Sequence, residues 1–479
     1  MRYHLIGIAG TAMASLAGLL RAKGHTVTGS DEGVYPPMST MLDELGIAYA
    51  RGFDPANLEP VPDVVVVGNA ISRGNEELEA MLDRGLRYTS AAVTLREEFL
   101  QGRHVLAVAG THGKTTTTSI LAWLLERAGL APSFLVGGVA ENFGSSFRLT
   151  DSDLFVVEAD EYDTAYFDKG PKMWHYRPRT AVVTNVEFDH ADIYRDERAY
   201  RFAFERFVNL VPRSGTLVLG WEGELERSLA GRSWAPVESY GIGSVPDAHG
   251  VPEHPRWRAT DVEQGREGSA FRIVHAGDDL GVFRTPLAGD FNVKNCLAAV
   301  AAARAVGASW DGIRDGLATF RSVRRRMEIR GEVDGVTVVD DFAHHPTAVR
   351  ETIAAARALF AGARLFAIFE PRSYTAQRKE FQDAFRAALA SADRVVLAGL
   401  FHPERYDAQT AMDPTQLVRD LAGAGVRADY LPRVDDIVAT VADEAASGDV
   451  LLVMSNGGFG GIHGKLLEAL RARSPRRRV

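Results

Sequence analysis

The residues with the clearest chemistry lie in one short stretch, Gly110 to Thr116, which reads GTHGKTT. An apolar run, Val105 to Val108, precedes it, and a pattern with apolar residues on one helical face follows it. A glycine loop between a strand and a helix directs backbone amides and a helix N-terminus at anionic oxygens. Lys114 adds a full charge, and the Thr115 hydroxyl is placed to ligate the Mg²⁺ that accompanies ATP. The stretch therefore predicts a polyphosphate site.

The alternative is an ordinary strand-to-helix turn. The common P-loop pattern has a glycine where this chain has Val108, which weakens the generic match. However, an ordinary turn does not explain why the only lysine between Lys23 and Lys169 is Lys114. We therefore expect the whole loop to contact the nucleotide, through Gly110, Thr111, His112, Gly113, Lys114, Thr115 and Thr116.

Acidic residues follow a second apolar run, Leu154 to Val157, at the end where a parallel strand presents ligand groups. They are Glu158, Asp160, Glu161 and Asp163. A carboxylate is a hard oxygen ligand that suits Mg²⁺. A solvated acidic loop is an adequate alternative for Asp163, but it fits Glu158 poorly, so we expect Glu158 beside the phosphates.

Two further polar groups belong to the same predicted unit. His190 lies shortly after a predicted strand, Ala181 to Thr184, and its spacing leaves open whether it binds a metal, because histidine is not the expected ligand of a hard cation. Asn292 and Asn295 open an alanine-rich helix, where amides three residues apart share one face and can reach a nucleotide. An N-cap role is the alternative for Asn292. For residues 221–283 the pattern predicts a small antiparallel excursion.

The N-terminal segment reads as a βαβ nucleotide-binding unit, with a strand over Tyr3 to Ile8, a helix ending near Ala22 and a second strand that leads to Asp31. Its loop lacks the third glycine of GxGxxG and by itself does not distinguish NAD from a UDP-sugar. Ser39 or Thr40 is predicted to cap the next helix. The residues expected at the ligand are Gly7, Gly10, Thr11, Ala12, Met13, Ser30, Asp31, Asn69, Ala70 and Ile71.

The C-terminal segment alternates apolar strands with amphipathic helices, which predicts a parallel, doubly wound sheet. Candidate binding loops follow two of its strands, at residues 370–374 and 455–461. Length and pattern together predict an α/β protein of three domains, with boundaries at 1–102, 103–320 and 321–479.

Composition excludes several classes of protein. The net charge of −9 argues against a nucleic-acid partner, and the single cysteine, Cys296, excludes a disulfide framework. Met1 to Ile8 does not resemble a signal peptide, and no apolar run approaches the roughly 20 residues that span a bilayer. We expect a cytoplasmic protein without membrane insertion.

Six segments of the chain resemble the motifs of the Mur ligases. In order along the chain they are GTHGKTTTTS, VVEADEYD, VTNVEFDHADIY, FNVKN, RRRMEIRGE and DDFAHHPTAV. The resemblance covers essentially the whole chain. It implies an ATP-dependent ligase of cell-wall metabolism that needs ATP and Mg²⁺, with a Rossmann-like N-terminal UDP-sugar domain, a central P-loop ATPase domain and a Rossmann-like C-terminal amine-binding domain.

Within the family, three further segments resemble the branch that recycles cell-wall peptides: SDEGVYPPMST, EPRSYT and MSNGGFGGIHGKLL. Enzymes of that branch join L-alanyl-γ-D-glutamyl-meso-diaminopimelate to UDP-N-acetylmuramate. The branch that adds L-alanine is the alternative. The resemblance places Thr115, Glu158 and His190 at the metal ions, and Arg326 and Asp341 at the ATP together with Asn292 and Asn295. Acceptor contacts are expected from Arg372, His344, Asn456 and Gly458.

Two other function classes fit part of the chain. A nicotinamide-dependent dehydrogenase would use the N-terminal loop but leave the second phosphate loop without a role. A P-loop switch or transport ATPase would use the second loop but not the other two nucleotide-type sheets.

Overall fold

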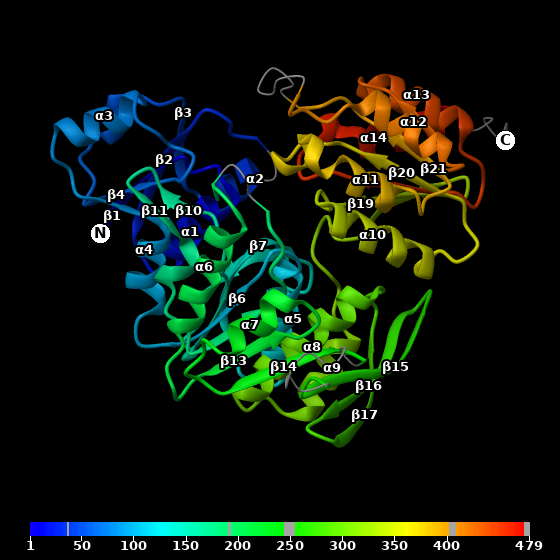
Figure 1. Cartoon of the computed structure of the whole chain (residues 1–479). Coiled ribbons are helices and arrows are strands. Elements are labelled where there is room, and N and C mark those ends of the chain that lie inside the picture. The colour runs from blue at the N-terminus through cyan, green and yellow to red at the C-terminus, as the bar shows by residue number, and fades with distance from the viewer. Residues whose placement is uncertain (36–37, 190–192, 244–253, 402–408, 474–479) are drawn as a thin grey trace, which may run out of the picture.

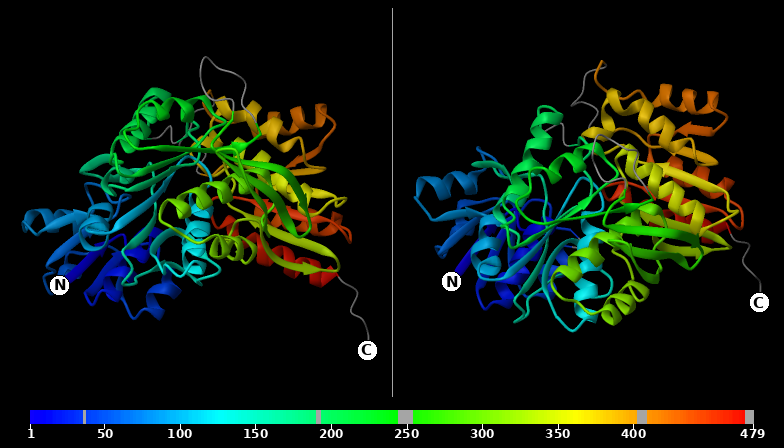
Figure 2. Two further views of the ribbon diagram at one scale, coloured as in Figure 1. Left: turned by 90° about the horizontal axis from the view of Figure 1, so that it is seen from below. Right: turned by 60° about the horizontal axis from the view of Figure 1, so that its bottom comes forward.

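The computed structural model describes residues 1–35, 38–189, 193–243, 254–401 and 409–473. Three large sheets follow one another along the chain, built from strands within residues 2–90, 104–285 and 328–454. Figure 2 shows the first unit (blue) and the third (orange to red) on opposite sides of the central one. The predicted α/β fold in three units is confirmed, whereas the boundaries remain a prediction.

The first sheet has five parallel strands in the order β3-β2-β1-β4-β5. The strands are β1 (Arg2–Ile6), β2 (Thr26–Asp31), β3 (Ala48–Arg51), β4 (Val64–Val67) and β5 (Tyr88–Ser90). The strand order reverses between β1 and β4, where loops commonly bind ligands. The helices are α1 (Thr11–Ala22), α2 (Met38–Glu44), α3 (Glu76–Asp83) and α4 (Ala91–Leu95). The predicted cap is wrong: α2 already begins at Met38, so Ser39 and Thr40 lie inside it.

The central sheet has ten strands in the order β17-β16-β15-β14-β13-β12-β6-β9-β7-β8. Its middle strands are β6 (His104–Ala109), β9 (Leu154–Glu158) and β12 (Thr180–Val183). Towards one edge come β7 (Ser133–Ala140) and β8 (Ser145–Arg148), and towards the other β13 (Thr216–Gly220) and β14 (Val237–Ile242). A separate hairpin pairs β10 (Asp163–Ala165) with β11 (Asp168–Pro171).

Both faces of this sheet are covered, which explains why β6 is apolar from Val105 to Ala109. Leu106 and Val108 pack in the cluster that includes α5 (Lys114–Arg127), α8 (Asp290–Ala305) and α9 (Trp310–Ala318). Val105 and Ala107 face the opposite cluster, which includes α6 (Glu197–Asn209). One further helix, α7 (Glu224–Ala230), packs near β13.

The predicted antiparallel pairing is confirmed in the segment after β14. β15 (Trp257–Gly265), β16 (Gly268–His275) and β17 (Asp278–Thr285) form an antiparallel ribbon. Because β15 also pairs with β14 in parallel, the ribbon extends the central sheet instead of leaving it.

The third sheet has six strands in the order β18-β19-β23-β20-β21-β22. They are β18 (Glu328–Val333), β19 (Val336–Asp341), β20 (Leu365–Phe369), β21 (Arg394–Leu397), β22 (Arg427–Tyr430) and β23 (Val450–Met454). All pairs are parallel except β18 with β19, so the predicted doubly wound sheet carries one antiparallel edge strand. The helices are α10 (Pro346–Leu359), α11 (Gln382–Leu389), α12 (Pro414–Gly423), α13 (Val434–Glu444) and α14 (Ile462–Arg473). Within the described ranges, no helix of any unit combines the length and apolarity needed to span a bilayer.

Candidate active site

The loop between β6 and α5 is the centre of the candidate site. Gly110 and Gly113 have φ angles of +135° and +82°, a region that side chains other than hydrogen rarely tolerate. A β-carbon at Gly110 would lie 1.9 Å from the Thr184 hydroxyl, and one at Gly113 would lie 2.5 Å from Asn295 Oδ1. Both glycines are therefore required by the shape of the loop, whose Thr111 and His112 amides donate to the carbonyl and the side-chain oxygen of Asn185 at 2.9 and 2.8 Å.

Lys114 is buried and points back into this loop. Its Nζ donates to the carbonyl of Gly110 at 2.6 Å and to the two carboxylate oxygens of Glu161 at 2.8 and 3.1 Å. Burial opposes the charge, but Glu161 and Asp160 outweigh it and raise the pKa of the Lys114 ammonium. The Lys114 ammonium is therefore stabilised in its charged form by its ion pair with Glu161.

Thr115 and Glu158 meet on the other side of the lysine. The Thr115 hydroxyl donates to Glu158 Oε1 at 2.8 Å, and the Gly137 amide donates to Oε2 at 2.6 Å. Burial and the neighbouring Asp160 raise the pKa of Glu158. A hydroxyl beside a carboxylate is a pair of hard oxygen donors, so this donor set fits Mg²⁺.

The two asparagines of α8 link that helix to α5. Thr117 donates to Asn295 Oδ1 at 3.1 Å, and Asn295 donates to Asn292 Oδ1 at 3.2 Å. The N-cap alternative for Asn292 is wrong, because α8 begins at Asp290 and its cap is Gly289.

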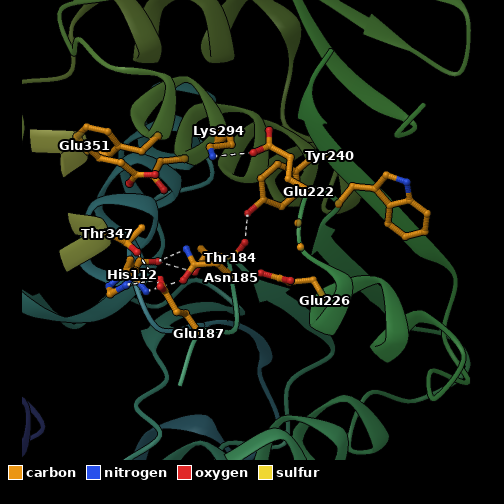
Figure 3. A pocket seen from close by; sticks show the side chains of 16 residues that line it. His112, Thr184, Asn185, Glu187, Glu222, Glu226, Tyr240, Lys294, Thr347 and Glu351 are labelled. Atoms are coloured by element: carbon orange, nitrogen blue, oxygen red, sulfur yellow. Dashed lines mark hydrogen bonds and ion pairs between the residues drawn. The ribbon is translucent and has the colours of Figure 1, made fainter. Parts of the chain in front are cut away.

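A cavity of about 190 Å³ lies beside the loop, between the central and third units (Figure 3). His112, Gly113 and Asn295 line it, and Thr347 and Glu351 of α10 close it from the third unit. The wall also contains four residues that were not assigned to a site from the sequence: Glu222, Glu226, Tyr240 and Lys294. Lys294 lies in the FNVKN motif, from which only the two asparagines were predicted. Lys294 pairs with Glu222 at 2.9 Å, and Glu226 accepts from the Val186 amide at 2.8 Å, so this wall is polar and has more carboxyl groups than cations.

Three family models match the chain: the Mur ligase catalytic domain over residues 2–101, the Mur ligase middle domain over 108–303 and the Mur ligase glutamate ligase domain over 325–457. The chain is 44% identical over 475 residues to the UDP-N-acetylmuramate–L-alanyl-γ-D-glutamyl-meso-2,6-diaminoheptandioate ligase of Escherichia coli, covering 98% of each protein. The chain belongs to the Mur ligase family. It is therefore an ATP-dependent ligase, as the sequence predicts.

Two further Mur ligases are similar to the chain over nearly its whole length. A crystal structure of a murein peptide ligase from Psychrobacter arcticus superimposes with a TM-score of 0.73 at 38% identity over 98% of both chains. The UDP-N-acetylmuramate–L-alanine ligase of Roseiflexus sp. is 36% identical over 476 residues, covering 95% of each protein.

In this Mur ligase the third unit reaches the phosphate loop through Arg326. Its Nη2 lies 3.5 Å from the Thr115 hydroxyl. Asp341, at the end of β19, accepts hydrogen bonds of 2.8 Å from the amides of Met327 and Ala343. Burial raises the pKa of Asp341 although Arg326 lies near it. Asp341 thus fixes the turn that presents Arg326.

The acceptor candidates lie beyond the carboxyl ends of β19, β20 and β23. The Arg372 guanidinium stacks 3.7 Å from the centre of the Phe401 ring and lies so close to Gly457 that a β-carbon there would be 2.3 Å away. Asn456 Oδ1 is buried and accepts no hydrogen bond within the described part of the chain. Gly458 faces open space, and His344 is held by a contact of 2.9 Å with the Phe342 carbonyl.

The residues predicted to bind a ligand at the first sheet include both exposed and buried ones. Gly10, Thr11, Asn69 and Ala70 are accessible to a ligand. Ser30 is buried and donates to Glu77, while Asp31 accepts from the amides of Ala9 and Gly33, so both shape the loop. Gly7 has a φ of +85°, and Ala12, Met13 and Ile71 complete the predicted set around the same loops. His190 lies outside the described residues.

Glu161 provides a test of the buried ion pair. We expect Glu161→Gln to lower the free energy of unfolding by about 3–5 kcal/mol, because it leaves the Lys114 ammonium buried beside a neutral amide. The control is Asp163→Asn, which breaks the exposed pair with Lys169 and should cost less than about 1 kcal/mol. Urea denaturation measures both, and equal effects would contradict a buried charge at Lys114.

Proposed function

We propose that this Mur ligase joins the tripeptide L-alanyl-γ-D-glutamyl-meso-diaminopimelate to UDP-N-acetylmuramate and converts ATP to ADP and phosphate in the process. The observation that carries the proposal is that full-length relatives named for this reaction are more similar to the chain than relatives named as L-alanine ligases. Such a reaction reclaims peptides from the cell wall.

The chemistry requires activation of a carboxylate. The lactyl carboxylate oxygen of the muramate attacks the γ-phosphorus of ATP, which releases ADP and leaves an acyl phosphate. The amine of the tripeptide then attacks the acyl carbon, loses a proton, and expels phosphate as the amide forms. Phosphoryl transfer depends on positioning and neutralisation of charge, so the reaction needs no nucleophilic side chain.

We assign the nucleotide to the loop and the adjoining cavity. Lys114 and the amides of the loop neutralise phosphate oxygens, and Arg326 adds a second cation from the third unit. Thr115 and Glu158 would hold Mg²⁺, which when bound supplies further neutralisation of the phosphates. By family resemblance we add His190 at the metal and Asp341, Asn292 and Asn295 at the nucleotide.

The remaining substrates are assigned to the outer units, with domain boundaries near residues 102 and 320. The UDP-sugar lies at the carboxyl edge of the first sheet, where the strand order reverses. The tripeptide lies along residues 455–461, where Gly458 leaves space and Arg372 offers a planar donor for carboxylates. Asn456 Oδ1 supplies a buried acceptor for an ammonium group. Closure of the units keeps water from the acyl phosphate.

The acceptor is tested by comparing kcat/KM for the tripeptide and for L-alanine with the same UDP-sugar and ATP. A site whose buried polar groups pair with the tripeptide would leave them unpaired when L-alanine binds. Such a site discriminates against the smaller ligand by roughly 10⁴ or more, so we expect kcat/KM to favour the tripeptide by a factor of that size. Equal or better use of L-alanine would move this enzyme to the L-alanine-adding branch.

Lys114→Ala tests the phosphate loop. Loss of this contact should remove about 3 kcal/mol or more of transition-state stabilisation while UDP-sugar binding stays nearly unchanged, because the sugar binds another unit. Steady-state kinetics and calorimetry with the UDP-sugar measure the two quantities. Activity within about tenfold of the wild type would be incompatible with the assignment.

Glu158→Gln tests the magnesium assignment. An amide is a weaker ligand than a carboxylate for a hard cation, so the Mg²⁺ concentration for half-maximal rate should rise at least severalfold. A titration of rate against Mg²⁺ at saturating ATP measures this. Asp163→Asn serves as the matched control, and an unchanged titration for Glu158→Gln would place the carboxylate away from the metal.

A further inference from the structure

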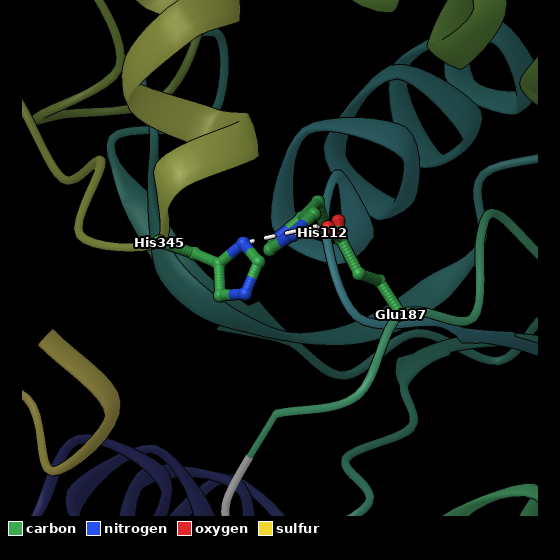
Figure 4. Close-up of side chains that lie close together, drawn as sticks. All are labelled: His112, Glu187 and His345. Atoms are coloured by element: carbon green, nitrogen blue, oxygen red, sulfur yellow. Dashed lines mark hydrogen bonds and ion pairs between the residues drawn. The ribbon is translucent and has the colours of Figure 1, made fainter. Parts of the chain in front are cut away.

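Two histidines and a glutamate meet beside the phosphate loop, where His112 and Glu187 also line the cavity. His112 Nε2 lies 3.2 Å from Glu187 Oε2, and His345 Nδ1 lies 3.8 Å from the same oxygen (Figure 4). One ligand atom from each residue can be chosen so that all lie within 4.8 Å of one another. The His112 and His345 rings are 4.8 Å apart at 41°.

Hydrogen bonding accounts for only part of this cluster. Glu187 Oε1 accepts from the Thr347 hydroxyl at 2.7 Å, and Oε2 pairs with His112. His345 is 2% exposed, yet its Nδ1 accepts only a long hydrogen bond of 3.4 Å from the Thr347 amide and lies 3.8 Å from Glu187 Oε2, and its Nε2 has no hydrogen-bond partner among the described residues. Most buried polar groups are satisfied, so an imidazole held this weakly needs another explanation.

The donor set and spacing suit a transition metal. Zn²⁺ binds imidazole nitrogen and carboxylate oxygen at about 2.0–2.2 Å, so ligand atoms around a tetrahedral ion lie about 3.3 Å apart. The separations of 3.2 and 3.8 Å from Glu187 Oε2 are close to that value. Burial of His345 favours the neutral imidazole, which is the form that ligates metals.

We propose that His112, Glu187 and His345 form a site for one divalent transition-metal ion of the Zn²⁺ type, separate from the Mg²⁺ donors Thr115 and Glu158. Imidazole ligands favour Zn²⁺ or Co²⁺ over Mg²⁺, which prefers oxygen. A water molecule can supply the fourth ligand.

The site joins two units of the chain. His112 belongs to the phosphate loop and Glu187 to the segment after β12, whereas His345 caps the N-terminus of α10 in the third unit. A bound ion would therefore fix the third unit against the phosphate loop. Because the ion binds only when these ligands are assembled, it should also stabilise the folded chain.

The test is metal binding by the full chain in the absence of nucleotide. Co²⁺, which reports coordination through its visible absorption, is titrated first, and Zn²⁺ is then used to displace it. We expect one ion per chain, Co²⁺ bands of a four-coordinate complex, no displacement by excess Mg²⁺, and a higher unfolding temperature with Zn²⁺. Since the readout is binding without substrates, it does not depend on the proposed ligase reaction.

Variants then locate the ion. His345→Asn, which keeps a capping acceptor for α10, and His112→Asn should each weaken Co²⁺ binding at least tenfold. The matched control is His175→Asn, because His175 also pairs with a carboxylate, Asp168 at 2.9 Å. Glu158→Gln should leave Co²⁺ binding unchanged. Circular dichroism verifies folding, and if His345→Asn does not fold, Glu187→Gln takes its place with the same expectation.

Three outcomes would overturn the proposal. One is the lack of stoichiometric Co²⁺ binding by the wild type. Another is equal binding by His345→Asn, His112→Asn and the wild type. The third is loss of Co²⁺ binding in Glu158→Gln, which would put the ion at the Mg²⁺ donors instead.

Discussion

An ammonium group buried between carboxylates is the interaction on which this site depends. Lys114, Glu158 and Glu161 are 8%, 7% and 0% exposed, and each charge would cost several kcal/mol to bury alone. The parallel pairing of β6 with β9 sets Val108 opposite Glu158, which brings the carboxylates to the end of the strand that leads into the loop. The geometry of the charges is thus fixed by the register of two adjacent strands. The Lys114 ammonium is thereby held in place at the N-terminus of α5.

The third unit contacts this loop from two directions. Arg326 approaches Thr115 on one side, while Thr347 and His345 approach Glu187 on the other. Asp341 ties the first of these contacts to the end of β19 through the Met327 amide. The position of the third sheet is therefore coupled to the groups that surround the phosphates. This coupling gives a physical reason why a ligase with substrates on separate units can respond to the nucleotide in one of them.

Much of the fold could be predicted from the sequence because the central strands are apolar on both faces. The run Val64 to Val67 is the strand itself, and Leu365 to Phe369 and Val450 to Met454 also match their strands. The glycine loop after β6 and the carboxylates after β9 could be predicted because each group follows its strand directly in the sequence. Helix starts were predicted less well. Asn292 and Ser39 are good caps by type, but each helix begins one or two residues before them, which is the extent by which helix ends commonly vary.

Contacts between the units could not be predicted from the sequence pattern. The sequence identifies His112 as a residue of the phosphate loop from its neighbours in the chain, but it does not bring His112 together with Glu187. His345 lies beside these residues because the N-terminus of α10 packs against the central unit. The hydrophobic periodicity of a single helix does not predict such a contact. Glu222, Tyr240 and Lys294 were missed in the cavity wall because the fold of the central unit brings them together from positions far apart in the sequence. Local sequence determines which residues stand at the edge of each sheet, whereas the chemistry at the junction depends on how two such edges face each other.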